Sequence, residues 1–218
     1  MTTTYDTFLP ELMPYVHDVP EFVAINALRN AAIEFCNKSE YWIFEYPSVS
    51  SVALQGDYPF QAASLPTTDC EVKRILQGWY NYQPIIPMGQ EDLAAIYINQ
   101  DWRTVAGNPN YVTQKYQNTF TLVPGPGIAI ANAINLIVVL QPTRTSTGLD
   151  DYIYNQWAEA IAKGARARLY DTPNQPYYDP QKAQFYHAAF TSAISEAKAE
   201  RNRGLGRATL KVRPPRFF

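Results

Sequence analysis

The chain has 218 residues, of which 46% are hydrophobic and 17% are charged, a balance typical of a folded protein. The formal net charge of −2 excludes a chain that binds polyanions along its whole length, and two cysteines are too few for a disulfide scaffold. Residues 128–140 form the longest nearly apolar stretch, which is shorter than the roughly 18 residues of a membrane helix. The N-terminus lacks the pattern of a signal peptide. We therefore expect a soluble protein, made in a reducing compartment, with one large domain or one domain and a small appendage.

The first expected helix follows a short aromatic segment. Asp18 can cap this helix, and a proline two residues later fits its first turn. Apolar residues then recur at a spacing of three to four from Phe22 to Phe35, which predicts an amphipathic helix that ends near Ser39.

Strands are expected after residue 42, where aromatic and β-branched residues alternate with polar ones. Turn-forming sequences rich in glycine and proline separate these runs, and residues 91–96 suit a short helix. The expected strand runs are residues 42–54, 71–82, 111–117, 119–123 and 133–141. Together they predict an antiparallel β domain inserted between helices.

Two further helices are expected near the C-terminus. Acidic residues at 150–151 suit the N-terminus of the first, whose apolar stripe continues to Leu169. Gly164 lies inside this helix at a cost of about 1 kcal/mol relative to alanine, which the close approach of another backbone would offset. An aspartate followed by proline at 179–180 begins the second helix, which runs to about Asn202. A short loop between them predicts an antiparallel helical hairpin.

The expected fold class is therefore α+β: a helical bundle of three main helices with an inserted antiparallel β domain and an extended C-terminal arm. We divide the chain into residues 1–41, the N-terminal segment and first bundle helix; 42–145, the inserted β domain; 146–202, the hairpin that completes the bundle; and 203–218, a basic docking arm.

The basic charge is concentrated at the C-terminus. Residues 1–200 hold 12 Lys and Arg and all 20 acidic residues, a net charge of 12 − 20 = −8, whereas residues 201–218 hold six basic residues and no acid. Two glycines and two prolines in this segment oppose a regular helix. It is either a solvated tail or an arm that docks on a partner, and an arm for nucleic acid is the less favoured interpretation. The candidate docking residues are Arg207, Lys211, Arg213, Arg216, Phe217 and Phe218.

The sequence shows no catalytic motif and no metal-ligand spacing, and neither His17 nor His187 has a second histidine or cysteine at ligand spacing. We therefore predict no enzyme, no cofactor and no metal. The 16 tyrosines favour an interface or a sugar-binding platform, although a core role accounts for many of them. Candidate residues for contacts between subunits, which a solvated helix flank would also explain, are Lys163, Arg166, Arg168, Tyr177 and Tyr178.

Three sequence patterns occur in a recognisable order: residues 40–44 after the first helix, residues 149–165 at the start of the hairpin, and the aromatic face that follows residues 179–180. This order over residues 18–202 resembles the head-to-tail adaptor, or connector, proteins of short-tailed bacteriophages.

The resemblance implies a virion protein at the head–tail junction, assembled in the host cytoplasm as a ring of twelve copies. It implies the portal protein and the tail nozzle protein as partners, DNA that passes through the ring without sequence-specific binding, and no membrane contact. It also implies that the C-terminal arm reaches the portal. The alternative hypothesis is a carbohydrate-binding or receptor-binding tail module that uses the aromatic β region.

Overall fold

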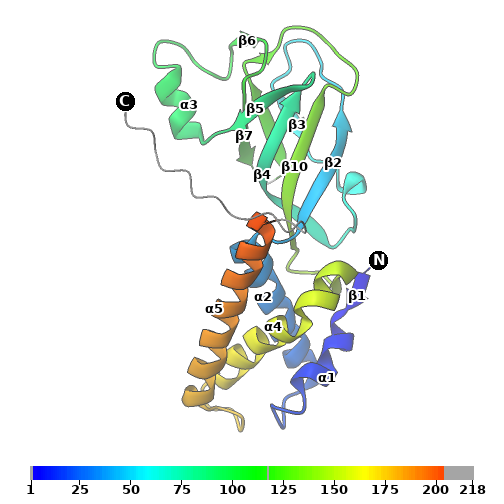
Figure 1. Ribbon diagram of the computed structural model, residues 1–218, viewed down its shortest axis with the longest axis vertical. Helices are drawn as coiled ribbons and strands as arrows, with labels where there is room; N and C mark the ends of the chain where they lie inside the picture. Colours follow the sequence, from blue (N-terminus) through cyan, green and yellow to red (C-terminus); the bar gives the residue numbers. More distant parts are fainter. Residues whose placement is uncertain (1, 117, 204–218) are drawn as a thin grey trace. The chain divides into compact units, whose positions relative to one another are not determined.

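The computed structural model describes residues 2–116 and 118–203 (Figure 1). The chain divides into two compact units. The β unit consists of residues 1–7 and 42–156, and the helical unit consists of residues 8–41 and the chain from Trp157 onward. Among the described helices, none is long and apolar enough to cross a membrane.

The β unit is built on a curled sheet of seven strands in the order β2-β10-β4-β5-β7-β8-β3 (Figure 1). Most neighbours are antiparallel, and β10 lies between β2 and β4. The strands are β2 (Ile43–Val49), β3 (Asp57–Pro59), β4 (Cys70–Tyr80), β5 (Gln83–Pro87), β7 (Tyr111–Tyr116), β8 (Thr119–Val123) and β10 (Ile134–Pro142). Inside the curl, the ring of Phe120 packs on Tyr58 and Phe60, which makes an aromatic core.

Smaller elements complete the β unit. β1 (Thr2–Thr4) pairs with β11 (Gly148–Asp150), and β6 (Ala106–Gly107) pairs with β9 (Gly125–Pro126). A short helix, α3 (Gln90–Ile96), connects β5 to the loop before β6. The buried side chain of Leu93 attaches α3 to a small cluster with Trp102 and Val123.

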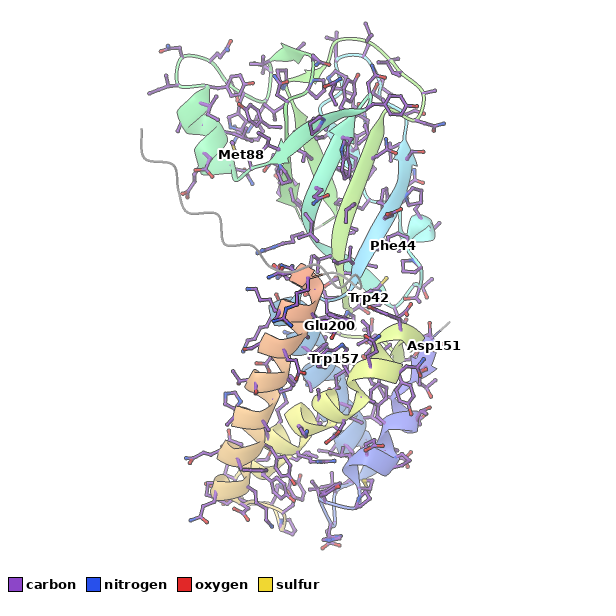
Figure 2. All side chains as sticks on the ribbon, viewed as in Figure 1. Trp42, Phe44, Met88, Asp151, Trp157 and Glu200 are labelled. Atoms are coloured by element: carbon purple, nitrogen blue, oxygen red, sulfur yellow. The ribbon has the colours of Figure 1, made fainter. Side chains whose placement is uncertain are left out.

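The helical unit contains α1 (Leu9–Leu12), α2 (Glu21–Ser39), most of α4 (Asp151–Tyr170) and α5 (Pro180–Arg203). The buried face of α2 places Phe35 against Trp157 of α4, with ring centroids 5.4 Å apart. Tyr41, just after α2, packs edge-on against the same Trp157 and donates a hydrogen bond of 3.0 Å to Glu200 of α5. Figure 2 labels Trp157 and Glu200, which come from these two helices.

The predicted fold class, a three-helix bundle with an inserted antiparallel β domain, is wrong. The described residues form five α-helices and a large curled sheet of seven strands. The sheet is mixed, because β5 and β7 run parallel, with Ile86 opposite Tyr111. Parallel neighbours need a crossover connection, which α3 and the loops around it provide. The alternation of residues along a strand shows its faces and does not show its direction, so the sequence pattern could not detect this pair.

Several expected elements are confirmed. The helix expected up to Ser39 is α2, and β8 has the predicted bounds. The prediction that Asp18 caps α2 is wrong, because the N-cap is Pro20 and makes no side-chain hydrogen bond. Asp179 does cap α5, accepting hydrogen bonds of 3.1 Å from the main-chain N–H groups of the second and third residues after it.

Candidate docking surfaces

The six residues expected to dock on a portal, Arg207, Lys211, Arg213, Arg216, Phe217 and Phe218, lie outside the described residues. The expected extended C-terminal arm lies outside them as well.

Two of the basic residues expected at a subunit interface make ion pairs within the helical unit. Lys163 is 2.8 Å from Glu159, one turn earlier on α4. Arg168 pairs with Glu34 of α2, which also pairs with Lys38. Burial raises the pKa of Glu34, but the hydrogen bonds from Lys38 and Arg168 lower it by more, so this carboxyl titrates below its usual range. The pair of Arg168 with Glu34 links α4 to α2, whereas the other two pairs each lie within one helix.

Arg166, the third of these basic residues, is buried, with 3% of its surface exposed. Its guanidinium lies 3.7 Å from the ring centroid of Tyr15 and 5.3 Å from that of Tyr186. It also donates a hydrogen bond to the carbonyl oxygen of Glu11, so it connects α4 to the segment before α2. A buried cation between two rings gains from both ring faces. The hydroxyl of Tyr170 donates to the carbonyl oxygen of Tyr15, which strengthens the same attachment.

The two candidate tyrosines of the loop before α5 differ in exposure. Tyr177 is buried, and Tyr178 is exposed. Of these two tyrosines, Tyr178 is therefore the one that presents its ring at the surface of the helical unit.

A groove of about 400 Å³, here called the helical groove, lies between α2, α4 and α5. Its lining is apolar around Phe190, and charged groups of Glu34, Arg168 and Asp171 line it as well. His187 also lines the groove. The sequence gives this histidine no second histidine or cysteine at ligand spacing. The groove's full lining is Glu34, Gly164, Ala167, Arg168, Asp171, Pro180, Ala183, Gln184, His187 and Phe190.

Three loops of the β unit, between β2 and β3, between β4 and β5 and between β9 and β10, lie at one end of the sheet (Figure 1). They carry four large apolar side chains that are exposed. The exposed fractions are 90% for Tyr82, 75% for Leu54, 64% for Ile128 and 50% for Val52. We call these four residues the loop patch. They could not be identified from the sequence, because they are distributed over three loops and no periodic pattern connects them.

The loops that carry the loop patch are fixed to one another by hydrogen bonds. Buried Ser51 is the centre of this network: its N–H donates to the Ile130 carbonyl oxygen, and its hydroxyl accepts from the Ile130 N–H, both at 2.9 Å. The Ser51 hydroxyl is also 3.3 Å from the hydroxyl of Tyr80, at the end of β4. The Leu54 N–H donates to the Pro126 carbonyl oxygen at 2.7 Å. The loop patch is therefore presented by a rigid framework.

The described residues contain no group of three or more His, Cys, Asp or Glu side chains that could hold a metal ion. Both thiols are free and buried, and burial raises the pKa of Cys36 and of Cys70, which keeps them protonated at neutral pH. Asp150 accepts a hydrogen bond from the Tyr152 N–H at 2.9 Å, which confirms the expected capping at the start of α4.

The sequence matches the family of SU10 adaptor proteins over residues 3–213, which includes both compact units. No curated protein matches the sequence. The match confirms the resemblance to head-to-tail adaptors inferred from the order of helices and aromatic residues. Because it extends over nearly the entire chain, the protein belongs to the SU10 adaptor protein family, whose members are structural proteins of phages.

Proposed function

We propose that this chain forms a ring, with twelve copies in the fully assembled virion, that joins the portal protein to the tail nozzle protein and surrounds the path of the DNA. The observation that carries the proposal is the family match over residues 3–213, which includes both units and most of the basic C-terminal segment. A phage adaptor is a structural component of the head–tail junction, with portal and tail components as its neighbours.

The charge distribution supports two parts of this proposal. Residues 1–200 carry a net charge of −8 (12 basic and 20 acidic residues), and an acidic channel wall would repel the DNA backbone and leave the DNA free to slide. Residues 201–218 carry six basic residues and no acid, and end in two phenylalanines. We assign portal docking to Arg207, Lys211, Arg213, Arg216, Phe217 and Phe218, because arginine and aromatic side chains are frequent anchors at protein interfaces.

Contacts between neighbouring copies are assigned to the helical unit. Exposure supports this assignment for Lys163, Arg168 and Tyr178, which lie at the surface of the unit. Arg166 and Tyr177 are buried within one copy, so any contribution from them would be to hold the surface in place.

The test is to mix the purified protein with portal rings from the same virion and to image the mixture, with mass determination of each species. We expect a second layer on the portal, and the mass gives the number of copies. Deletion of residues 204–218 should abolish loading and leave the circular dichroism spectrum and the melting temperature of the two units unchanged.

A matched control separates charge from length. A chain with R207Q, K211Q, R213Q and R216Q keeps every residue position and loses four positive charges, and it should load weakly. A truncated protein that still forms a layer on the portal would exclude the assignment of portal docking to the C-terminal residues. If the full chain remains a monomer and ignores the portal, glycan binding by the β unit becomes the hypothesis to test.

A further inference from the structure

Two of the four residues of the loop patch occupy backbone conformations that their side chains disfavour. Leu54 has φ = 64° and Tyr82 has φ = 63°, both in the left-handed region that glycine, asparagine and aspartate adopt most readily. Both side chains are also among the most exposed apolar groups of the β unit, so burial does not compensate for the backbone strain. Strain of this kind is retained mainly where a side chain is needed for function.

The segments that carry the loop patch contain no charged residues. Residues 46–56, 75–90 and 116–143 contain no Asp, Glu, Lys or Arg, although these residues make up 17% of the chain. These three segments include the loops that carry Val52, Leu54, Tyr82 and Ile128. A protein surface that stays in contact with water normally includes charged residues. The absence of charge from these segments therefore favours a partner surface that is itself uncharged and apolar.

The same observations disfavour two other occupants. Nucleic acid needs Lys and Arg for its phosphates, and a peripheral membrane site commonly combines apolar groups with basic residues. The hydroxyl of Tyr58 accepts from the Val52 N–H at 3.0 Å and the hydroxyl of Ser51 is bonded to the Ile130 N–H, so these two groups serve the framework. Tyr82 exposes its hydroxyl, so a glycan that binds the wild type and not the variant described below would overturn the inference.

We infer that the loop patch is the docking surface for an uncharged, apolar surface of the tail nozzle protein. The inference rests on the proposed function, which assigns the portal to the basic C-terminal residues. An adaptor joins two different components, and this chain has two regions of opposite chemistry: a C-terminal sequence rich in arginine, and the loop patch, whose segments contain no charged residue. A rigid apolar surface binds with little loss of conformational entropy, because its loops are already ordered by hydrogen bonds.

The test uses substitutions that remove the apolar side chains and relieve the backbone. L54N with Y82N places asparagine at two left-handed positions, so the melting temperature should stay the same or rise. The variant should load onto portal rings as the wild type does. The affinity of the loaded complex for the purified nozzle protein should fall by about tenfold or more, because two exposed apolar anchors are lost. The matched control is I98N, which removes another highly exposed apolar side chain of the β unit outside the loop patch.

The stages of assembly separate the two proposals. If the wild type does not load onto the portal, the proposed function fails before the loop patch is tested. If L54N with Y82N loads and binds the nozzle protein with wild-type affinity, the docking inference is overturned. The docking inference is equally overturned if this variant loses portal loading, self-association or binding to neutral phosphatidylcholine vesicles. Each of these losses would assign the loop patch to a different occupant.

Discussion

The ring of Phe190 on α5 fills the space directly over Gly164 on α4. A Cβ atom on Gly164 would lie 2.8 Å from the Cε2 atom and 2.9 Å from the Cζ atom of this ring, closer than such atoms can pack. From the sequence, we expect another backbone to approach this glycine. The structure corrects that expectation, because the neighbour is a buried aromatic side chain whose ring rests against the bare helix.

Gly164→Ala should therefore destabilise the helical unit, although alanine is the better helix former. The alanine gains about 1 kcal/mol of helix propensity, and overpacking against a buried ring costs about 1–3 kcal/mol. We expect a net loss of up to about 2 kcal/mol in the free energy of unfolding, measured by urea denaturation.

The control is the double variant Gly164→Ala with Phe190→Leu, compared with Phe190→Leu alone. Once the ring is gone, the added methyl group has room, and the alanine should cost nothing or stabilise. An equal cost in both backgrounds would show that the ring is not the source of the clash.

Arg166 should be among the most important charged residues for the stability of the helical unit. Arg166→Met keeps most of the apolar volume and removes the charge between Tyr15 and Tyr186 and the hydrogen bond to Glu11. Cation–π contacts of desolvated groups contribute about 2 kcal/mol, and hydrogen bonds of charged groups about 1.5–3 kcal/mol. We expect a loss of about 2–4 kcal/mol, with faster hydrogen exchange in residues 9–16.

Arg166→Lys is the informative comparison, because it keeps the charge and loses the flat guanidinium that stacks on the rings. It should recover only part of the stability. If Arg166→Lys matched the wild type, charge alone would hold this segment, and stacking on Tyr15 would be unimportant.

The helices could be predicted from the sequence because their signals are local. Apolar spacing and an aspartate followed by proline predicted α2 and α5 nearly to their last residues. The strands β1 and β11 could not be predicted, because Thr2–Thr4 acquires its strand conformation only from pairing with a segment about 145 residues away. The prediction of an antiparallel β domain failed for the same reason: the parallel pairing of β5 with β7 depends on a crossover and not on either strand's composition.

The candidate sites also divide into those that are visible in the sequence and those that only the fold reveals. The C-terminal charge is visible in composition, so its docking role is a prediction that the sequence alone can make. The sequence groups Arg166 with Lys163 and Arg168 because the three lie on one helix. Burial is a tertiary property, so only the fold distinguishes the buried guanidinium of Arg166 from its more exposed neighbours. The loop patch has one sequence signal, the absence of charge over residues 46–56, 75–90 and 116–143.

The ion pairs of Glu34 predict a pH dependence of stability. Because hydrogen bonds from Lys38 and Arg168 hold the pKa of Glu34 below its unfolded value, its contribution is fully present above about pH 4.3 and is lost as the pH falls through the folded pKa. Both partners are partly exposed, so the contribution should be about 0.2–1 kcal/mol. The measurement is the difference in free energy of unfolding between the wild type and Glu34→Gln, at pH 7 and at decreasing pH.

That difference should shrink toward zero below about pH 4.3, and high salt at pH 7 should reduce it as well. Glu159→Gln is the control at a more exposed pair on a single helix, where Lys163 is the partner. A difference for Glu34→Gln that stays constant down to the acid limit would mean that shape, and not charge, links α4 to α2.

Gly148 should be essential for the attachment of the N-terminus. It lies opposite Thr4 in the pairing of β11 with β1, and a Cβ atom there would overlap the carbonyl oxygen of Thr3 and lie 2.9 Å from the Cγ2 atom of Thr2. Since the obstacle is mainly backbone, it cannot be relieved by a change of rotamer. Gly148→Ala should therefore separate the strands and expose residues 2–4 to exchange.

Hydrogen exchange followed by mass spectrometry measures this directly, with loss of protection confined to the N-terminal peptide and to residues 148–150. Thr3→Val is the control: it removes the 2.7 Å hydrogen bond from the Thr3 hydroxyl to Asp151 and keeps the backbone pairing, so it should weaken protection only slightly. Because β1 pairs only with β11, the seven-stranded sheet should keep its protection in both variants. Loss of protection across β4 and β10 in Gly148→Ala would instead make the N-terminal strand a condition for folding of the whole β unit.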